Sequence, residues 1–120
     1  MGRIQEIPAQ FNMDTGVVHN GTVYLAAQYS FKQTLNEQLE DIFQKIDQLL
    51  TQVNSNKQCI LTVDVCLAFI ESYPTLCHHY AVWLANCQRR PMLSCIGAQL
   101  IKLDGAPHRL AEIKVTAAVE

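Results

Sequence analysis

The chain has 120 residues, of which 49% are hydrophobic and 17% charged, and its formal net charge is −2. A disordered chain is excluded, because it could not bury so much apolar surface, and the length fits one domain over residues 1–120. The nine basic residues are scattered along the sequence. Because nucleic-acid binding needs a clustered cationic face, we expect no nucleic-acid partner.

No segment has the length and apolarity of a signal peptide or a membrane span, so we expect no membrane contact. The five cysteines are odd in number and contain no Cys-x-x-Cys pair; they are Cys59, Cys66, Cys77, Cys87 and Cys95. This pattern is typical of reduced thiols, and we therefore expect a cytoplasmic protein without disulfides.

The N-terminal part is rich in β-forming residues. Residues 3–7 are predicted to form a short strand that ends before Pro8. Residues 17–19 and 22–29 are predicted to form two further strands. Asn20-Gly21 between them indicates a hairpin, because both residues tolerate the positive φ of a type I′ turn.

The clearest helix covers residues 35–53, where apolar residues recur at spacings of three and four. They are Leu35, Leu39, Ile42, Ile46, Leu49 and Val53. Thr34 and Glu37 are typical of a capping box at the helix start.

Residues 59–70 alternate regularly and predict a long strand. One predicted face is apolar, with Leu61, Val63, Val65, Leu67 and Phe69. The other carries Thr62, Asp64, Cys66 and Ala68. Ser72 and Pro74 suit the start of a second helix that runs to about Gln88.

Residues 92–101 and 110–119 are the last two predicted strands. The resulting order, β-β-β-α-β-α-β-β, predicts an α+β protein with one sheet and two helices on one face. The uncovered face then carries Thr62, Asp64, Cys66, Glu112 and Thr116. That mixture is too polar for a core and too apolar for free solvent, so it predicts a subunit interface.

Few residues are candidates for chemistry. The spacing of Cys77, His78 and His79 on a helix directs them about 100° apart, so we expect no metal site. Arg89 and Arg90 can either bind an anion or simply follow the end of a helix, where the dipole favours cations.

Glu112 is the strongest candidate, since it lies in the middle of a strand on the predicted interface face. A carboxylate there can act as an acid or orient a water molecule. The alternative is a structural ion pair with Lys114 or Arg109, and the spacing leaves both interpretations open.

Several blocks in this order resemble the Rid (YjgF-like) family. Residues 19–28, His-Asn-Gly-Thr-Val-Tyr-Leu-Ala-Ala-Gln, resemble the family's Gly-x-x-Val-Tyr-Val-Ser-Gly-Gln block. Glu37-Gln38 is similar to the start of its Glu-Gln-Thr helix. Residues 111–119, Ala-Glu-Ile-Lys-Val-Thr-Ala-Ala-Val, resemble its closing Val-Glu-Ile-Glu-Ala-Ile-Ala strand. The resemblance covers nearly the whole chain from Val17 onward.

The resemblance implies a chorismate-mutase-like fold and a homotrimer with small-molecule clefts between subunits. It implies hydrolysis of reactive enamines and imines to 2-keto acids and ammonia, without a cofactor. The family glutamate that orients water corresponds to Glu112. The substrate-binding positions correspond to Gln28, Cys77, Leu93, Ser94 and Cys95.

One departure from the family pattern concerns the ligand. The family arginine that clamps the substrate carboxylate is replaced by Leu93, which supplies no charge. Arg89, Arg90 or Arg109 can be its substitute. The sequence therefore supports two hypotheses, an imine deaminase with a rebuilt cleft and a non-catalytic trimer that binds a metabolite or a protein.

Overall fold

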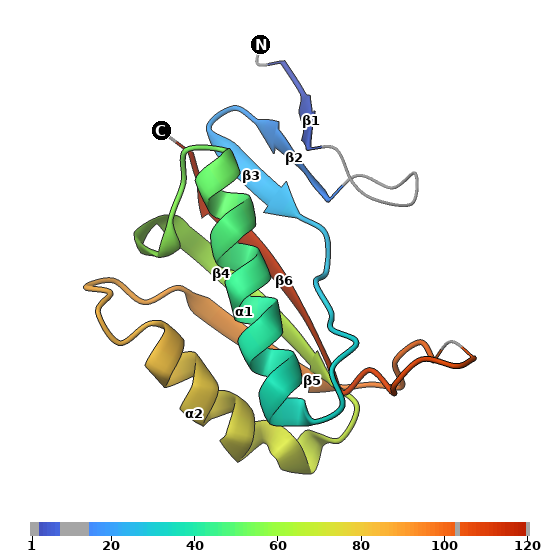
Figure 1. The fold of residues 1–120 in the computed structure, drawn as a ribbon. Helices are drawn as coiled ribbons and strands as arrows, with labels where there is room; N and C mark the ends of the chain where they lie inside the picture. Colours follow the sequence, from blue (N-terminus) through green and yellow to red (C-terminus); the bar gives the residue numbers. More distant parts are fainter. Residues whose placement is uncertain (1–2, 8–14, 103, 120) are drawn as a thin grey trace.

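The computed structural model describes residues 3–7, 15–102 and 104–119 (Figure 1). The strands are β1 (Gln5–Ile7), β2 (Gly16–His19), β3 (Thr22–Leu25), β4 (Ile60–Leu67), β5 (Met92–Gly97) and β6 (Ala111–Ala118). The helices are α1 (Leu35–Gln52) and α2 (Tyr73–Trp83), with short 3-10 turns η1 (Lys57–Cys59) and η2 (Ile70–Ser72). The predicted order of strands and helices is confirmed.

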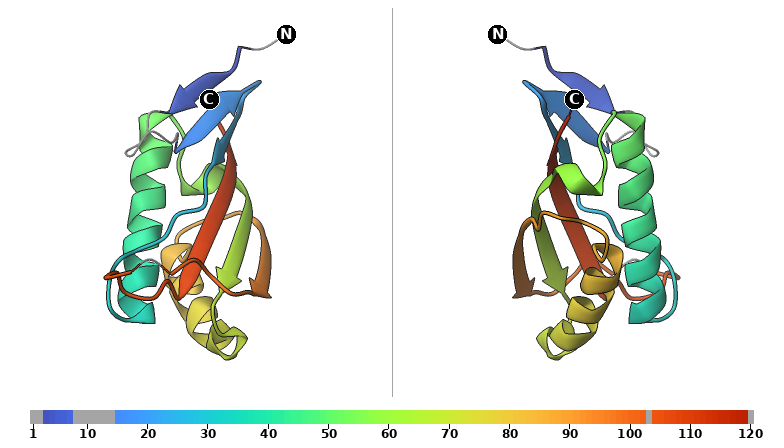
Figure 2. Two further views of the ribbon diagram at one scale, coloured as in Figure 1. Left: turned by 90° about the vertical axis from the view of Figure 1, so that its right-hand side faces the viewer. Right: turned by 90° about the vertical axis from the view of Figure 1, so that its left-hand side faces the viewer.

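The six strands form one mixed sheet in the order β1-β2-β3-β6-β4-β5. Every neighbouring pair is antiparallel except β4 and β5, which α2 connects as a parallel crossover. Both helices lie on the same side of this sheet (Figure 2). The predicted α+β class, one sheet with two helices on one face, is therefore confirmed.

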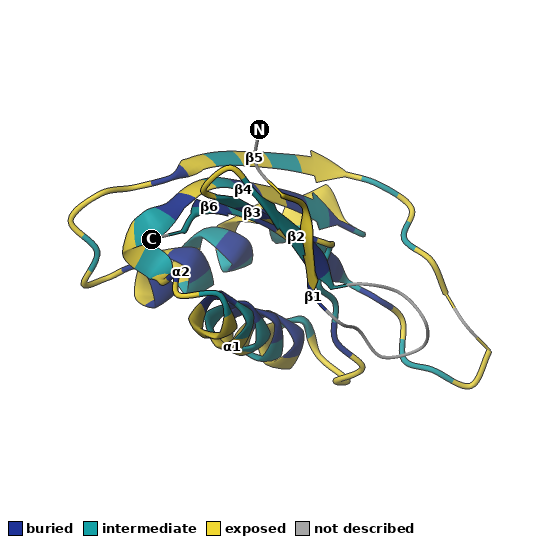
Figure 3. Cartoon of the chain, turned by 90° about the horizontal axis from the view of Figure 1, so that it is seen from above, coloured by how far each residue is buried: buried dark blue, intermediate teal, exposed yellow. Residues whose placement is uncertain are grey.

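The core lies between the helices and the sheet (Figure 3). Leu39, Ile42 and Ile46 of α1 are fully buried, as the spacing of the apolar stripe predicts. Phe43 and Trp83 stack with their ring centroids 4.3 Å apart and join α1 to α2. Burial of each large apolar side chain stabilises the fold by about 1.5–3 kcal/mol.

Two local structures predicted from the sequence, the hairpin turn and the N-terminal cap of α1, are present. The hairpin residues Asn20 and Gly21 have φ values of 50° and 78°, which a type I′ turn requires. The hydroxyl of Thr34 accepts a hydrogen bond from the backbone N–H of Glu37 and so caps α1.

Several predicted boundaries are wrong. Helix α2 ends at Trp83 rather than near Gln88, and Lys57 Nζ donates to the Trp83 carbonyl oxygen at this end at 3.0 Å. Three strands end clearly earlier than predicted, β3 at Leu25, β4 at Leu67 and β5 at Gly97, and the bounds of β2, α1, the start of β4 and β6 differ by one residue. Each strand ends where its ladder of paired residues ends. Within residues 3–7 the strand is limited to Gln5–Ile7, and Pro8 lies outside the described residues.

The predicted apolar face of β4 is wrong at both ends. The register between β4 and β6 shifts between Ile60 and Thr62, so Ile60 is buried and Leu61 is 39% exposed. Phe69 lies beyond the strand and is exposed. The central residues Val63, Val65 and Leu67 are buried as predicted.

The face of the sheet away from the helices is polar at its centre. Cys66 lies opposite Glu112, and Thr62 lies opposite Thr116. Large apolar side chains border this polar centre and are exposed in the single chain: Tyr24 (48%), Met92 (71%) and Ile96 (59%). Within the described part of the chain, neither helix has the length and apolarity to cross a membrane.

Candidate functional site

Glu112 lies near the start of β6 and pairs with Arg109, three residues earlier in the chain. The distance from Arg109 Nη1 to Glu112 Oε2 is 3.5 Å. The side chains are 10% and 20% exposed, respectively, so this ion pair is largely removed from solvent. The ion pair that was the structural alternative for Glu112 is therefore present, with Arg109 rather than Lys114 as the partner. A proton-handling role of Glu112 stays a prediction.

Arg109 is fixed by an aromatic ring and by the backbone around it. The guanidinium carbon lies 3.5 Å from the centroid of the Tyr29 ring, which is a cation–π contact. Tyr29 follows Gln28, whose backbone pairs with Ile113 of β6. The ring, the guanidinium and the Glu112 carboxylate therefore meet at the start of β6.

Gln38 is a further residue of this region that sequence reasoning missed. It lies in the second turn of α1 and is fully buried. Its Nε2 donates to the carbonyl oxygens of Lys32 at 3.0 Å and His108 at 2.9 Å. Its Oε1 accepts from the backbone N–H of Leu110 at 2.8 Å. Gln38 thus holds the backbone on both sides of Arg109.

The sequence contained a signal for Gln38. It stands four residues before Ile42 and eight before Ile46, which places an amide on the apolar stripe of α1. A polar side chain at such a position must find buried partners. The resemblance includes this residue only as part of a motif and gives it no role.

Leu93 and Cys95 lie on β5, which is an edge strand of the sheet. They pair with Val63 and Val65, and both side chains pack against the core on the helix side. Leu93 is thus half-buried among apolar groups and faces away from Glu112 in the same chain.

Cys77 and Cys95 belong to a group of thiols between α2 and the sheet. Burial raises the pKa of the Cys95 thiol, and the nearby Cys66 and Cys77 raise it further. A hydrogen bond with Cys77 raises the pKa of the Tyr73 hydroxyl. A raised pKa favours the protonated, uncharged forms of the Cys95 thiol and the Tyr73 hydroxyl.

The remaining two predicted site residues are Ser94 and Gln28. Ser94 pairs with Asp64 and is exposed on the face away from the helices. The Gln28 side chain donates to the carbonyl oxygen of Ala26 at 2.8 Å. A row of paired residues runs across the sheet: Gln28 forms a bridge with Ile113 of β6, Ile113 pairs with Val65 of β4, and Val65 pairs with Cys95 of β5. Three strand spacings separate Gln28 from Cys95, which is about 14 Å.

The structure therefore brings Gln28 near Glu112, and Cys77 near Cys95, but it does not bring the two groups together within one chain. Arg89 and Arg90 are also remote from Glu112. The guanidinium of Arg89 donates to the Ile60 carbonyl oxygen, and Arg90 is exposed after α2. In the described ranges, no three His, Cys, Asp or Glu side chains are arranged to hold a metal ion.

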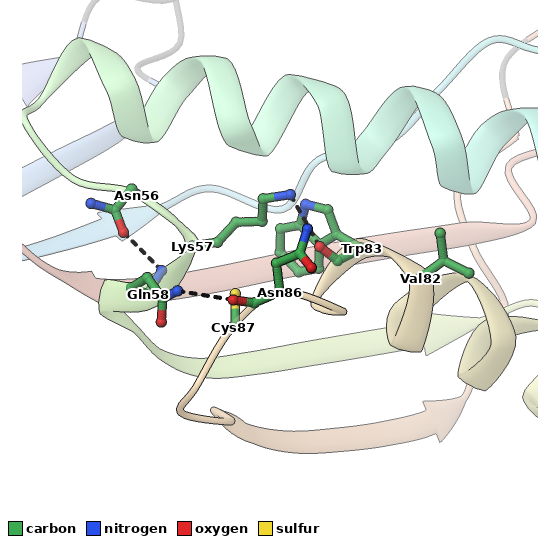
Figure 4. Close-up of a pocket in the computed structure, with 7 residues that line it drawn as sticks. All are labelled: Asn56, Lys57, Gln58, Val82, Trp83, Asn86 and Cys87. Atoms are coloured by element: carbon green, nitrogen blue, oxygen red, sulfur yellow. Dashed lines mark hydrogen bonds between the residues drawn. The ribbon is translucent and has the colours of Figure 1, made fainter.

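A surface hollow of about 410 Å³ opens between η1 and the end of α2 (Figure 4). Its polar groups already bond to one another, since Gln58 Nε2 donates to the Asn86 carbonyl oxygen at 3.3 Å and Lys57 Nζ donates to that of Trp83. The hollow contains none of the predicted site residues. The ion pair at β6 is therefore the better candidate site.

The fold and the position of Glu112 define a class, an α+β domain of the chorismate-mutase-like type with a carboxylate at the start of its last strand. Residues 4–119 match the family described as Endoribonuclease L-PSP. The chain belongs to this family, which includes the YjgF and Rid proteins.

Individual relatives agree with this assignment. A RutC family protein of Haemophilus influenzae is 29% identical over 117 residues, which cover 95% of this chain and 97% of the relative. A crystal structure of a YjgF family member from Neisseria meningitidis matches with a TM-score of 0.88 and 25% identity over 98% of this chain and 96% of the other. A Rid family protein from Yersinia pestis shares the fold, with a TM-score of 0.86, 20% identity and coverage of 98% and 100%.

Proposed function

We propose that this protein hydrolyses reactive imines or enamines in a cleft between the subunits of a cytoplasmic homotrimer. The observation that carries the proposal is Glu112, a carboxylate held at 3.5 Å from a buried arginine on the uncovered face of the sheet. The position of this residue in the closing strand agrees with the family's water-orienting glutamate.

The chemistry needs one group that handles protons. Glu112 accepts a proton as the oxygen of water bonds to the imine carbon, while the C=N electron pair moves to nitrogen. Glu112 then returns this proton to nitrogen, which gives a carbinolamine. The hydroxyl proton of the carbinolamine moves to nitrogen through Glu112 as the C=O bond forms and the C–N bond breaks, so that ammonia and a carbonyl compound leave. No redox step or cofactor is needed for this balance.

Two features support an assembled site. Leu93 and Cys95 face the helices, whereas Glu112 faces away from them, so one chain does not place both beside one ligand. The exposed apolar side chains of Tyr24, Met92 and Ile96 border the Glu112 face and suit contact with another subunit. Light scattering should therefore give the mass of a trimer at micromolar concentration, and a stable monomer would contradict the proposed assembly.

The activity is tested with 2-iminobutanoate, generated in place by an amino-acid dehydratase, and with release of ammonia as the measurement. Glu112→Gln keeps the shape but removes the proton acceptor, so turnover should fall about 100-fold or more. Glu71→Gln, which changes an exposed carboxylate in η2, is the matched control. Equal turnover by wild type and Glu112→Gln would refute the proposed role.

The alternative is a non-catalytic trimer that binds a metabolite or a protein. Leu93 favours it, because an apolar side chain occupies the position of the family's substrate clamp. No turnover by the intact wild-type trimer would select this alternative.

A further inference from the structure

Arg109 is unusual among the charged residues of this protein. It is 8% exposed, and no other Asp, Glu, Lys or Arg in the described ranges is buried to this degree. Burial of a charge is costly unless it is paired and hydrogen-bonded. Its one ion-pair partner, Glu112, is 3.5 Å away, which is longer than the roughly 2.7–2.9 Å of a strong charge-assisted hydrogen bond.

The guanidinium has bonding capacity to spare. Arginine carries about five N–H donors, and only Nη1 of Arg109 has a hydrogen-bond partner among the described residues. Among the described residues, the buried side-chain nitrogen and oxygen atoms that lack a hydrogen-bond partner are His19 Nδ1 and the Tyr80 hydroxyl oxygen. The nitrogens of Arg109 are not among them. The other guanidinium nitrogens of Arg109 therefore keep contact with solvent, where a ligand can reach them.

The orientation of Arg109 is set before any ligand binds. The Tyr29 ring covers one face of the guanidinium at 3.5 Å. Gln38 bonds to the backbone of His108 and Leu110 on either side. In Figure 1 the segment before β6 passes beside the first turns of α1, where Gln38 lies. A planar cation fixed on one face presents its in-plane N–H groups, the geometry that binds a carboxylate through two parallel bonds.

We propose that Arg109 is the carboxylate-binding residue of this protein, supplied from the segment before β6 in place of an arginine on β5. This inference rests on the proposed function for the reaction, imine hydrolysis. The binding of a carboxylate by Arg109 does not depend on that reaction. Arg109 Nη1 donates to the Glu112 carboxylate, and the ligand carboxylate accepts hydrogen bonds from the other guanidinium nitrogens of Arg109. The iminium nitrogen of a protonated 2-imino acid then balances the charge of Glu112.

The other two candidate arginines, Arg89 and Arg90, fit the role less well. The guanidinium of Arg89 is engaged by the Ile60 carbonyl oxygen. Arg90 is exposed, and its charge acts on Tyr80, which packs against Trp83 in the core. Neither contacts Glu112, so neither places a ligand carboxylate beside the proposed proton acceptor.

The test measures binding and requires no turnover. The probes are 2-oxobutanoate, a stable keto acid with the carbon skeleton of the imine, and its uncharged methyl ester. By calorimetry the wild-type protein should bind the acid about tenfold or more tightly than the ester. Arg109→Gln should abolish this preference, Arg109→Lys should retain part of it, and Arg90→Gln, the matched control, should leave it unchanged.

Each outcome decides the inference separately from the catalytic proposal. A preference for the acid that disappears in Arg109→Gln supports the inference even if the wild type releases no ammonia. Equal binding of acid and ester by the wild type, no binding of either, or full preference in a folded Arg109→Gln variant would overturn it. If Arg109→Gln does not fold, the wild-type ratio of the two affinities and its reduction in Arg109→Lys decide the question.

Discussion

The two regions that hold the predicted site residues differ in charge. The region between α2 and β5, here called the uncharged region, contains Leu93, Cys77 and Cys95, and none of these side chains is an Asp, Glu, Lys or Arg. The region at the start of β6 contains Arg109 and Glu112, a buried ion pair. The charged side chains among the predicted site residues are therefore concentrated at the start of β6, while β5 contributes apolar surface.

The same comparison explains why Gln38 matters. In the uncharged region the Tyr73 side chain makes a hydrogen bond with Cys77, whereas Gln38 makes three hydrogen bonds with the backbone around Arg109 and at Lys32. A buried network of this kind stabilises and orients at the same time, provided that every member has a partner.

Gln38→Ala should therefore have the largest effect on stability. It leaves buried carbonyl and N–H groups without partners, so the free energy of unfolding should fall by about 3 kcal/mol. Urea unfolding is the measurement, and Gln48→Ala, an exposed glutamine on the same helix, is the control. A loss no greater than that of the control would show that the Gln38 network does not hold the region together.

Leu93→Arg tests whether the uncharged region lacks a cation. The half-buried position makes the charge costly, so we expect a loss of about 1–2 kcal/mol in the free energy of unfolding. Because Arg109 already supplies a cation, turnover of 2-iminobutanoate should rise less than about tenfold. Leu93→Met is the control for side-chain volume. A larger gain would mean that β5, and not the entry to β6, is where the missing carboxylate clamp belongs.

The fold could be predicted from the sequence to a large extent, because its signals are local and repeated. The stripe of α1 and the Asn20-Gly21 turn each depend on neighbouring residues, and both have the predicted structure. The end of α2 was not predicted in this way, and the contact found there joins Trp83 to Lys57, which is remote from it in sequence. The register shift at Leu61 likewise arises from pairing with β6.

The site was less predictable than the fold for the same reason. The spacing allowed an ion pair between Glu112 and either Arg109 or Lys114, and only the path of the chain before β6 selects between them. The contact of Arg109 with Tyr29 joins residues 80 positions apart, and no periodicity reports such a pair. The roles of Leu93, Ser94, Cys95, Gln28 and Cys77 in binding a ligand stay predictions.

Ser30→Ala should reduce the free energy of unfolding less than Gln38→Ala does. The buried Ser30 hydroxyl donates to Asp41 Oδ2 at 2.6 Å, and its loss should cost about 1–2 kcal/mol. Burial raises the pKa of Asp41, but the hydrogen bond from Ser30 and the charges of Lys45 and Lys32 outweigh it, so the pKa is lowered below 3.8.

The sign of the pH dependence follows from that direction. A lowered folded-state pKa contributes stability above pH 3.8 that is lost as the pH falls through the folded value. The advantage of wild type over Ser30→Ala should therefore shrink below about pH 4 in urea unfolding. Thr51→Ala, which removes an exposed hydroxyl of α1, is the control. A difference that stays constant down to pH 2 would contradict the role of Asp41.

The smallest expected effect concerns Cys95 in the uncharged region. Burial raises the pKa of its thiol above 9.0, with further increases from Cys66 and Cys77. A raised folded-state pKa contributes stability that is present below pH 9.0 and is lost as the pH rises through the folded value. Wild type should therefore lose stability relative to Cys95→Ala between pH 8 and pH 10, by less than about 1 kcal/mol.

Alkylation of Cys95 by iodoacetamide, followed by mass spectrometry, should be slow at pH 7 because the thiolate is the reacting form. Fast alkylation at pH 7 in the folded protein would show that this region carries a thiolate, and the contrast with the charged entry to β6 would then fail.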